Sequence, residues 1–261
     1  MKRTLVQPNL NDFPTPFRHL LENCKVFDSS CSREARVWFL DRDGGYFLKS
    51  APKGSLAREA RMDRYFHGKG LTSAVLDYRS EERDWLLTAR VAGEDCTHAT
   101  YLAEPERLCE AFAAALRALH EQPCADCPVS DRMAEYFATV EKNYRAGTFD
   151  PSFLPREAKG MSADEAYAYV MAHKDRFQSD CLLHGDYCLP NILLDDWRFS
   201  GFIDLGNGGV GDRHVDLFWG VWTLEYNLKT PRYGSRFLDA YGRDGVDEEL
   251  LAVIGTAECF G

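Results

Sequence analysis

Short apolar runs separated by turn residues fill the first third of the chain. Runs of this length, bounded by Gly, Pro, Asp and Ser, predict strands joined by loops. Residues 56–66 instead carry apolar residues at helical spacing and predict an amphipathic helix. We therefore expect an antiparallel sheet with one helix, preceded by a short helix or approach segment near residues 17–21. The predicted strands are residues 25–27, 36–40, 46–49, 74–78 and 84–89.

Helical spacing dominates the sequence after residue 104. The strongest apolar stripe lies in residues 104–120, where Leu108, Phe112 and Leu119 fall on one helix face. Ser162, followed by Glu165 three positions later, predicts a capping box at the start of another helix. The fold class is therefore α+β, with a mainly helical second part. Further helices are predicted at residues 131–144, 162–173, 217–228, 237–241 and 248–254, and short strands at 182–183, 192–194 and 202–203.

The composition limits the class of protein. With 261 residues, the chain is long enough for two lobes with a core in each. No apolar run approaches the ~18 residues that a membrane span needs. The basic start of the chain is not followed by the apolar segment of a signal peptide. We therefore expect a cytoplasmic protein without a membrane partner.

Charge and cysteine content narrow the partners. The formal net charge of −10 argues against nucleic acid, whose binding proteins present basic faces, and favours a cationic partner. The nine cysteines are irregularly spaced and are expected to be free thiols. His120, Cys124 and Cys127 could hold zinc, but a second pair of ligands at metal spacing is absent.

Three side chains with acceptor oxygens follow the apolar runs of residues 182–204. These are Asp186, Asn191 and Asp204. Two carboxylates and an amide oxygen brought together at strand ends form a site of hard oxygen ligands, which suits Mg²⁺. One carboxylate can stay off the metal and orient a hydroxyl for attack on phosphorus.

The spacing of these residues matches protein kinases. Kinases carry H-R-D-x-x-x-x-N followed by D-F-G. Here, His184-Gly185-Asp186 is followed by Asn191 at the same distance, and then by Asp204-Leu205-Gly206. Either segment alone would be explained by an ordinary buried turn or a chance hairpin. Both in the right order favour a catalytic loop and a metal loop.

The same stretch resembles a known family. HGDYCLPN and GFIDLGNGGVGDRHVDL are similar to the motifs of the aminoglycoside 3′-phosphotransferases, the antibiotic-resistance kinases. The resemblance is dense over residues 182–217 and looser through residue 227. It implies a two-lobed, protein-kinase-like fold that transfers the γ-phosphate of ATP or GTP, with Mg²⁺, to the 3′-hydroxyl of an aminoglycoside. A polycationic aminoglycoside would also suit the acidic chain.

The resemblance implies roles for the matching residues. Asp186 would be catalytic, and Asn191 and Asp204 would hold the metal. Lys49, at the end of the third predicted strand, would bind the α- and β-phosphates and be held by Glu59. His184 and Asp216 would support the catalytic loop.

Nucleotide contacts are expected around a hinge near residues 88–93, which would divide the chain into residues 1–91 and 92–261. Ala89 and Val91 would lie against the adenine, with Phe47 as a stacking face. The loop of residues 28–32 would cover the phosphates, with Ser32 presenting a backbone N–H in place of the Gly-rich kinase loop.

Aminoglycoside contacts are expected from Glu157, Glu258 and Phe260, again through the resemblance. Two departures from the family pattern concern this region. Asn207 stands where the family has an Arg after D-x-G, so a positive group near the transferred phosphoryl is lost. The tail 256–261 has Ala257 where the family has an Asp, and Gly261 moves the terminal carboxylate by one residue.

Two alternative functions stay open at this point. One is a kinase of the same fold that phosphorylates another small hydroxylated metabolite. The other is a nucleotide-binding pseudoenzyme, for which the loss of Arg at residue 207 is the only indication. Whichever function is correct, we expect the protein to be a monomer or a weak dimer.

Overall fold

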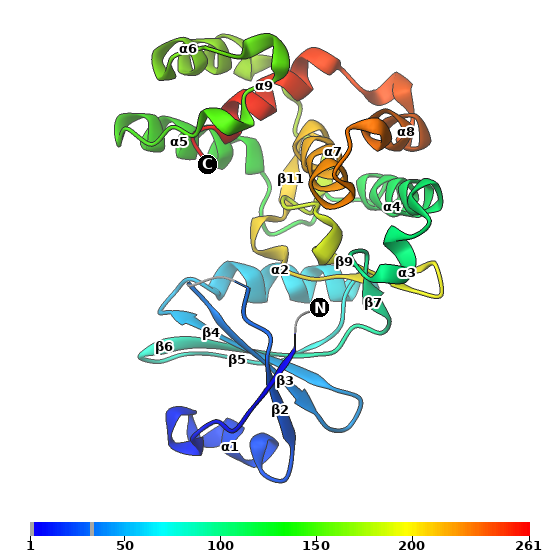
Figure 1. Ribbon diagram of the computed structural model, residues 1–261. Coiled ribbons are helices and arrows are strands. Elements are labelled where there is room, and N and C mark those ends of the chain that lie inside the picture. The colour runs from blue at the N-terminus through cyan, green and yellow to red at the C-terminus, as the bar shows by residue number, and fades with distance from the viewer. Residues whose placement is uncertain (1–2, 32–33) are drawn as a thin grey trace. The chain divides into compact units, whose positions relative to one another are not determined.

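The computed structural model describes residues 3–31 and 34–261, apart from the side chain of Glu157 (Figure 1). Contacts divide the chain into two compact units. The first comprises Met1–His98 and Pro190–Gly206, and the second comprises Ala99–Leu189 and Asn207–Gly261. The first unit therefore contains a segment from the second half of the sequence, which the sequence pattern does not indicate. The hinge near residues 88–93 stays a prediction.

A six-stranded antiparallel sheet forms the body of the first unit, in the order β1-β2-β3-β4-β6-β5. All five strands predicted from the sequence are present, and β1 is an edge strand that the sequence pattern missed. The strands are β1 (Thr4–Val6), β2 (Lys25–Asp28), β3 (Arg36–Asp41), β4 (Tyr46–Pro52), β5 (Val75–Ser80) and β6 (Arg83–Ala89).

The two faces of this sheet are covered by different helices. Alternate residues of a strand point to opposite faces. Leu48 packs with Phe17 of α1 (Thr15–Leu21), whereas Ala51 packs with Ala60 of α2 (Ala57–Gly68). Lys49 therefore points to the α2 face, as Ala51 does.

A hairpin from residues 192–202 completes the first unit. It consists of β9 (Ile192–Asp195) and β10 (Arg198–Phe202), and β7 (Glu94–Asp95) pairs with β9. The backbone N–H of Phe202 donates to the Leu71 carbonyl at 2.8 Å, and the Thr72 hydroxyl donates to the Phe202 carbonyl at 2.7 Å. These bonds fix the hairpin next to the end of α2.

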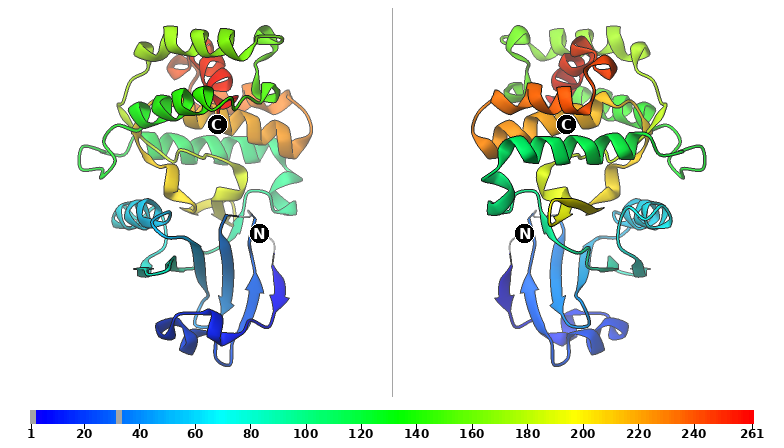
Figure 2. Two further views of the ribbon diagram at one scale, coloured as in Figure 1. Left: turned by 90° about the vertical axis from the view of Figure 1, so that its left-hand side faces the viewer. Right: turned by 90° about the vertical axis from the view of Figure 1, so that its right-hand side faces the viewer.

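The second unit is mainly helical, as predicted. The helix α4 (Pro105–His120) packs along α8 (Arg232–Tyr241), as Figures 1 and 2 show. Phe112 of α4 is fully buried and stacks on Tyr187 with ring centroids 4.4 Å apart. The remaining elements are α3 (Ala99–Leu102), α5 (Arg132–Arg145), α6 (Ala163–His173), α7 (His214–Leu228), α9 (Glu248–Glu258) and the two-stranded sheet of β8 (Cys181–Leu183) and β11 (Gly209–Gly211).

Short 3-10 helices connect several of these elements. They are η1 (Leu10–Asp12), η2 (Pro151–Phe153), η3 (Arg156–Ala158), η4 (Lys174–Arg176), η5 (Leu189–Asn191), η6 (Leu205–Asn207) and η7 (Arg243–Gly245). The α+β fold class is confirmed. In the parts of the chain that the structure describes, every helix is too short or too polar to cross a bilayer.

The capping box predicted at α6 is present, and it allows a test of local stability. The Glu165 N–H donates to the Ser162 hydroxyl, and the Ser162 N–H donates to the Glu165 carboxylate at 2.8 Å. Ser162→Ala should lower the free energy of unfolding by about 1 kcal/mol, because an N-cap acceptor is lost. Glu165→Gln keeps an acceptor and should cost much less. If urea unfolding showed the same decrease in the free energy of unfolding for both variants, this account would be contradicted.

Candidate active site

Lys49 is the centre of a charge cluster in the first unit. Its Nζ donates to both carboxylate oxygens of Glu59, at 2.9 and 2.8 Å, and to Asp204 Oδ1 at 2.9 Å. Strand β4 supplies the lysine, the first turn of α2 supplies Glu59, and the residues after β10 supply Asp204. The structure thus brings together the two residues that the resemblance paired, and adds Asp204 to them.

The charge state of Lys49 follows from these contacts. Burial alone would lower the pKa of the ammonium group, because it removes water from the charged form. The attraction of Glu59 and Asp204 is larger and raises the pKa of Lys49 above its usual value. Lys49 is therefore a cation throughout the physiological pH range.

A third carboxyl group, which the sequence pattern did not single out, lies near this cluster. Asp63 lies one turn after Glu59 on α2 and is 7% exposed. Burial, followed by repulsion from Glu59, raises the pKa of Asp63 well above its usual value. Two carboxylates thus share one ammonium group, and a third carboxyl group is buried one turn away on α2. Such an excess of acidic oxygen favours a further cation.

Asn191 and Asp204 flank the open end of the β9–β10 hairpin. Ile192 and Phe202 are paired in the hairpin, and the Ile203 N–H donates to the Asn191 carbonyl at 3.0 Å. The two predicted metal ligands are therefore brought together by local pairing. Asp204 has a φ of 62°, in the left-handed region that non-glycine residues adopt less often than glycine. An amide oxygen and a carboxylate oxygen are ligand types that suit Mg²⁺.

The residues predicted for adenine binding differ in their surroundings. Phe47 is half-buried, points to the same face as Lys49 two residues away, and packs on the Phe39 ring at 5.1 Å. Ala89 uses its N–H and carbonyl within the unit, with Ala74 and Ser73. Val91 is buried. Ser32 lies outside the described residues.

In the second unit, Asp216 holds the loop that carries Asp186. Its buried carboxylate accepts the backbone N–H groups of His184, at 2.8 Å, and Gly185, at 2.7 Å. His120 Nε2 also donates to it, at 3.2 Å, while His120 Nδ1 accepts from the Tyr241 hydroxyl at 2.8 Å. These contacts suit the supporting role expected for Asp216. Because both nitrogens of His120 are engaged, this ring is not a zinc ligand with Cys124 and Cys127.

The loop is also shaped by its first glycine. Gly185 has a φ of +81°, and a Cβ atom there would lie 2.0 Å from the Asn207 carbonyl oxygen. The Arg that kinases carry at this position could not be accommodated. His184 is fully buried and its Nδ1 accepts the Asp186 N–H at 3.3 Å, so the loop is held on both sides of Gly185.

Arg132, which the sequence did not single out, reaches residue 207 from the start of α5. Its Nε donates to the Asn207 carbonyl at 3.0 Å, and its guanidinium carbon lies 5.7 Å from the centre of the Tyr136 ring. A positive group is therefore present beside Asn207, although the family's Arg is missing there. No local sequence signal identifies this contact, because 75 residues separate its partners.

The predicted substrate residues are placed unequally. Glu258 is partly buried, and its Oε1 accepts the Tyr136 hydroxyl at 2.7 Å. Phe260 is fully buried and packs on Phe149 with ring centroids 5.3 Å apart. A ring without exposed surface cannot contact a substrate, so we correct its role to that of an anchor for the tail. Glu157 lies in η3, and its side chain is not described.

Burial governs the ionisation of Glu258. It raises the pKa of the carboxyl group to about 7, although hydrogen bonds from Tyr136 and Trp219 and the charge of Arg132 oppose this rise. Repulsion from Asp186 adds to the shift. Glu258 is thus poised between its neutral and charged forms near neutral pH.

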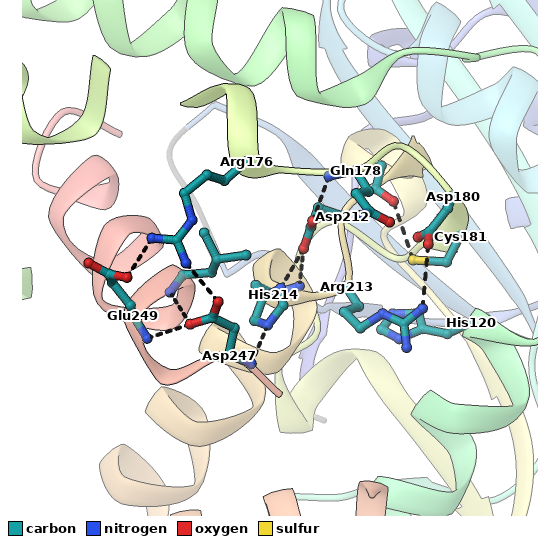
Figure 3. Close-up of polar contacts among 12 residues, drawn as sticks. His120, Arg176, Gln178, Asp180, Cys181, Asp212, Arg213, His214, Asp247 and Glu249 are labelled. Carbon is teal, nitrogen blue, oxygen red and sulfur yellow. Dashed lines mark hydrogen bonds and ion pairs between the residues drawn. The ribbon is translucent and has the colours of Figure 1, made fainter. Parts of the chain in front are cut away.

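A buried polar network connects the helix of Asp216 with the helix of Glu258 (Figure 3). Asp212 accepts His214 Nδ1 at 2.6 Å and the Gln178 N–H at 2.8 Å. His214 Nε2 accepts the Asp247 N–H at 2.8 Å, so the proton of this ring resides on Nδ1. The start of α7 is therefore fixed to the start of α9.

Gly185→Ala tests the close approach of the loop that carries Asp186 to Asn207. Gly147 has a similar φ of +75° but has open space around it, so Gly147→Ala measures the backbone strain alone. We expect Gly185→Ala to be less stable than Gly147→Ala by at least ~1 kcal/mol, because it adds a clash with backbone. Equal urea midpoints for the two variants would contradict the geometry.

Glu258→Gln tests the burial of this carboxyl group. A carboxyl with a pKa raised from 4.5 to about 7 binds a proton more tightly in the folded state, so it lowers stability as pH rises through that window. Relative to the unchanged protein, Glu258→Gln should therefore gain stability between pH 4.5 and pH 7. The exposed Glu121→Gln is the control. If urea unfolding gave the same stability difference between Glu258→Gln and the unchanged protein at pH 4.5 and at pH 7, the assignment would be refuted.

Comparisons with known proteins identify the family of the chain. Residues 24–252 match the family model described as the phosphotransferase enzyme family. The chain is 45% identical, over 97% of both lengths, to a probable aminoglycoside 3′-phosphotransferase of Lactococcus lactis subsp. lactis. It is 33% identical to a streptomycin 3″-kinase of Streptomyces griseus, covering 69% of this chain and 70% of that protein.

A solved structure is also similar to this chain over nearly its whole length. The crystal structure of an aminoglycoside-3′-phosphotransferase of type VIII superposes with a TM-score of 0.79 at 28% identity, covering 97% of this chain and 99% of that one. The family match and the shared fold both extend over nearly the whole sequence. The chain therefore belongs to the phosphotransferase enzyme family.

Proposed function

We propose that this protein transfers the γ-phosphoryl group of ATP or GTP to the 3′-hydroxyl of an aminoglycoside antibiotic and so confers resistance. The observation that carries the phosphoryl-transfer part is the Lys49 ammonium held by Glu59 and Asp204. The name of the L. lactis relative supports the acceptor. The net charge of −10 supports a cationic acceptor as well.

Lys49 binds the α- and β-phosphates in this proposal. A lysine free to rotate would lose side-chain entropy on binding, whereas Glu59 already holds the Nζ in one position. The adenine lies along the segment that follows β6. Among the described residues, no backbone hydrogen bond engages Val91, so its N–H and carbonyl suit the adenine edge better than those of Ala89.

Asn191 and Asp204 would hold Mg²⁺, for which their oxygens are suited. The ion supplies neutralisation of the phosphate charge when it is bound. Asp204 shares its carboxylate with Lys49, so its orientation is fixed beforehand. The surplus of carboxyl groups around Lys49 adds to the attraction for a divalent cation.

Asp186 orients the acceptor hydroxyl and takes up its proton. The loop of Asp186 is fixed by Asp216 and by the close packing of Gly185 on Asn207. Because phosphoryl transfer has a loose transition state, most of the acceleration comes from positioning and charge neutralisation. Strong basicity of Asp186 is therefore not required.

Glu258 binds an ammonium group of the aminoglycoside. An ammonium group beside this carboxyl would favour its charged form and so oppose the effect of burial. Glu157 is proposed as a second acidic contact, from the family resemblance alone. We place the reaction in the cytoplasm, where the nucleotide is available, and expect a monomer or weak dimer.

A second candidate is a kinase of the same fold that phosphorylates a different hydroxyl or a different small molecule. The tail favours it, because Ala257 replaces an acidic residue and Phe260 is buried. The streptomycin 3″-kinase relative carries the name of a different acceptor and position. A pseudoenzyme is less well supported, since Lys49, Asp186, Asn191 and Asp204 are all retained.

Phosphorylation of an acceptor panel tests the proposal. Kanamycin, neomycin and amikacin should be phosphorylated, whereas tobramycin, which lacks the 3′-hydroxyl, should not. Asp186→Ala should lower turnover by roughly 10²–10⁴-fold while nucleotide binding persists, because the group that receives the proton is removed. Phosphate transfer to tobramycin would exclude the 3′ position. Nucleotide binding without transfer to any acceptor would favour the pseudoenzyme, and full turnover of Asp186→Ala would remove its assignment.

A further inference from the structure

Four aromatic side chains form a continuous row in the second unit. Trp219, Trp222 and Tyr226 lie three and four residues apart on α7, and therefore on one face of the helix. The Trp222 and Tyr226 rings are stacked, with centroids 5.0 Å apart and planes 9° apart. Trp219 meets Trp222 edge-on at 5.3 Å, and Phe153 of η2 stacks on Trp222 at 6.1 Å. We call these four residues the aromatic row.

One end of the aromatic row is open to water. Tyr226 is 58% exposed, and it is the one aromatic residue among the large apolar side chains that the described structure leaves exposed. Trp222 is half-buried. Stacked rings that stay in contact with water mark a binding surface more often than an isolated exposed residue does.

The other end reaches Glu258. Trp219 is the inner end of the row and packs against the core cluster that contains Ala257 and Cys259, on either side of Glu258. Seven residues separate Trp219 from Tyr226, which corresponds to about 10 Å along the helix. A ligand whose ammonium group is bound by Glu258 could therefore lie along the row towards Tyr226.

A cation already lies on the outer ring. Lys229 Nζ is 4.2 Å from the centre of the Tyr226 ring, while Trp222 is stacked on that ring. Lys229 follows the last turn of α7 and ends the helix in the left-handed conformation, with a φ of 57°. The Tyr226 ring can thus hold an ammonium group, the group that aminoglycosides carry on several rings.

We infer that the Tyr226 face binds an ammonium-bearing ring of the aminoglycoside remote from the phosphorylated ring, with Lys229 occupying this place in the free protein. The inference rests on the proposed function. An aromatic ring offers a sugar both an apolar surface for its C–H groups and a negative face for its ammonium group. Acidic residues alone would supply charge without the flat surface.

Binding measured by calorimetry, without nucleotide turnover, tests the inference. Kanamycin B and neamine are the probes, because neamine lacks only the amino-bearing third ring. Tyr226→Ala should weaken the binding of kanamycin B about three- to fivefold, which is the magnitude of an exposed cation–π contact. The affinity for neamine should change by less than about twofold. Tyr233→Ala is the matched control, since the Arg232 guanidinium lies 5.5 Å from that ring in α8.

A second variant separates this role from a purely structural one. Lys229→Asn removes the competing cation and keeps a residue that tolerates the left-handed conformation. It should tighten kanamycin B binding by at least about twofold. Tyr226→Ala affecting both ligands equally, or neither, would overturn the inference, as would unchanged or weaker binding by Lys229→Asn. If the unchanged protein binds neither ligand, the proposed function itself is overturned, and the inference with it.

Discussion

The shared lysine cation is the interaction on which the first unit depends. The Lys49 ammonium group binds Glu59 of α2 and Asp204 after the β9–β10 hairpin, and Asp63 is buried one turn further along α2. Without Lys49, the carboxylates of Glu59 and Asp204 would repel one another. The attraction joins a strand, a helix and a hairpin that lie far apart in the sequence. The same electrostatic imbalance also suits the metal ion and the phosphate groups of the proposed function. The charge cluster of Lys49 therefore serves both the fold of the first unit and the proposed chemistry.

Asp216 has a comparable role in the second unit, but it acts through hydrogen bonds. Its carboxylate satisfies two consecutive backbone N–H groups that would otherwise be buried without an acceptor. A buried carboxylate with several donors gives the loop one conformation, and the network of Asp212 and His214 extends this rigidity to α9 (Figure 3). The loop of Asp186, the proposed proton acceptor, is therefore held at His184 and Gly185.

Much of the fold and of the candidate site was predictable from the sequence, for physical reasons. Strands and helices with one buried face leave a periodic pattern, so all five predicted strands of the large sheet are present. The kinase-like order of charged residues is also readable in the sequence, so Lys49 and Glu59 could be paired before their contact was seen. The capping box at Ser162 depends on two residues three positions apart and is equally local.

Contacts between distant segments could not be predicted in this way. The placement of the hairpin with the first unit depends on bonds from Phe202 to Leu71 and Thr72, which have no signature in either segment. The clash that requires Gly185 arises from the Asn207 carbonyl, and a carbonyl is the same for every residue. Phe260 was misjudged because an aromatic residue near the tail suits both a ligand surface and a core.

The division into units has a consequence for how this protein could arise or be rearranged. The chain passes from one unit to the other three times, after His98, Leu189 and Gly206. A fragment that stopped at the first crossing would lack the hairpin that pairs with β7, and its edge would be left without hydrogen-bond partners. The halves are thus unsuited to exchange between genes as separate modules. Recombination within this family is expected to preserve the interleaved order of the segments.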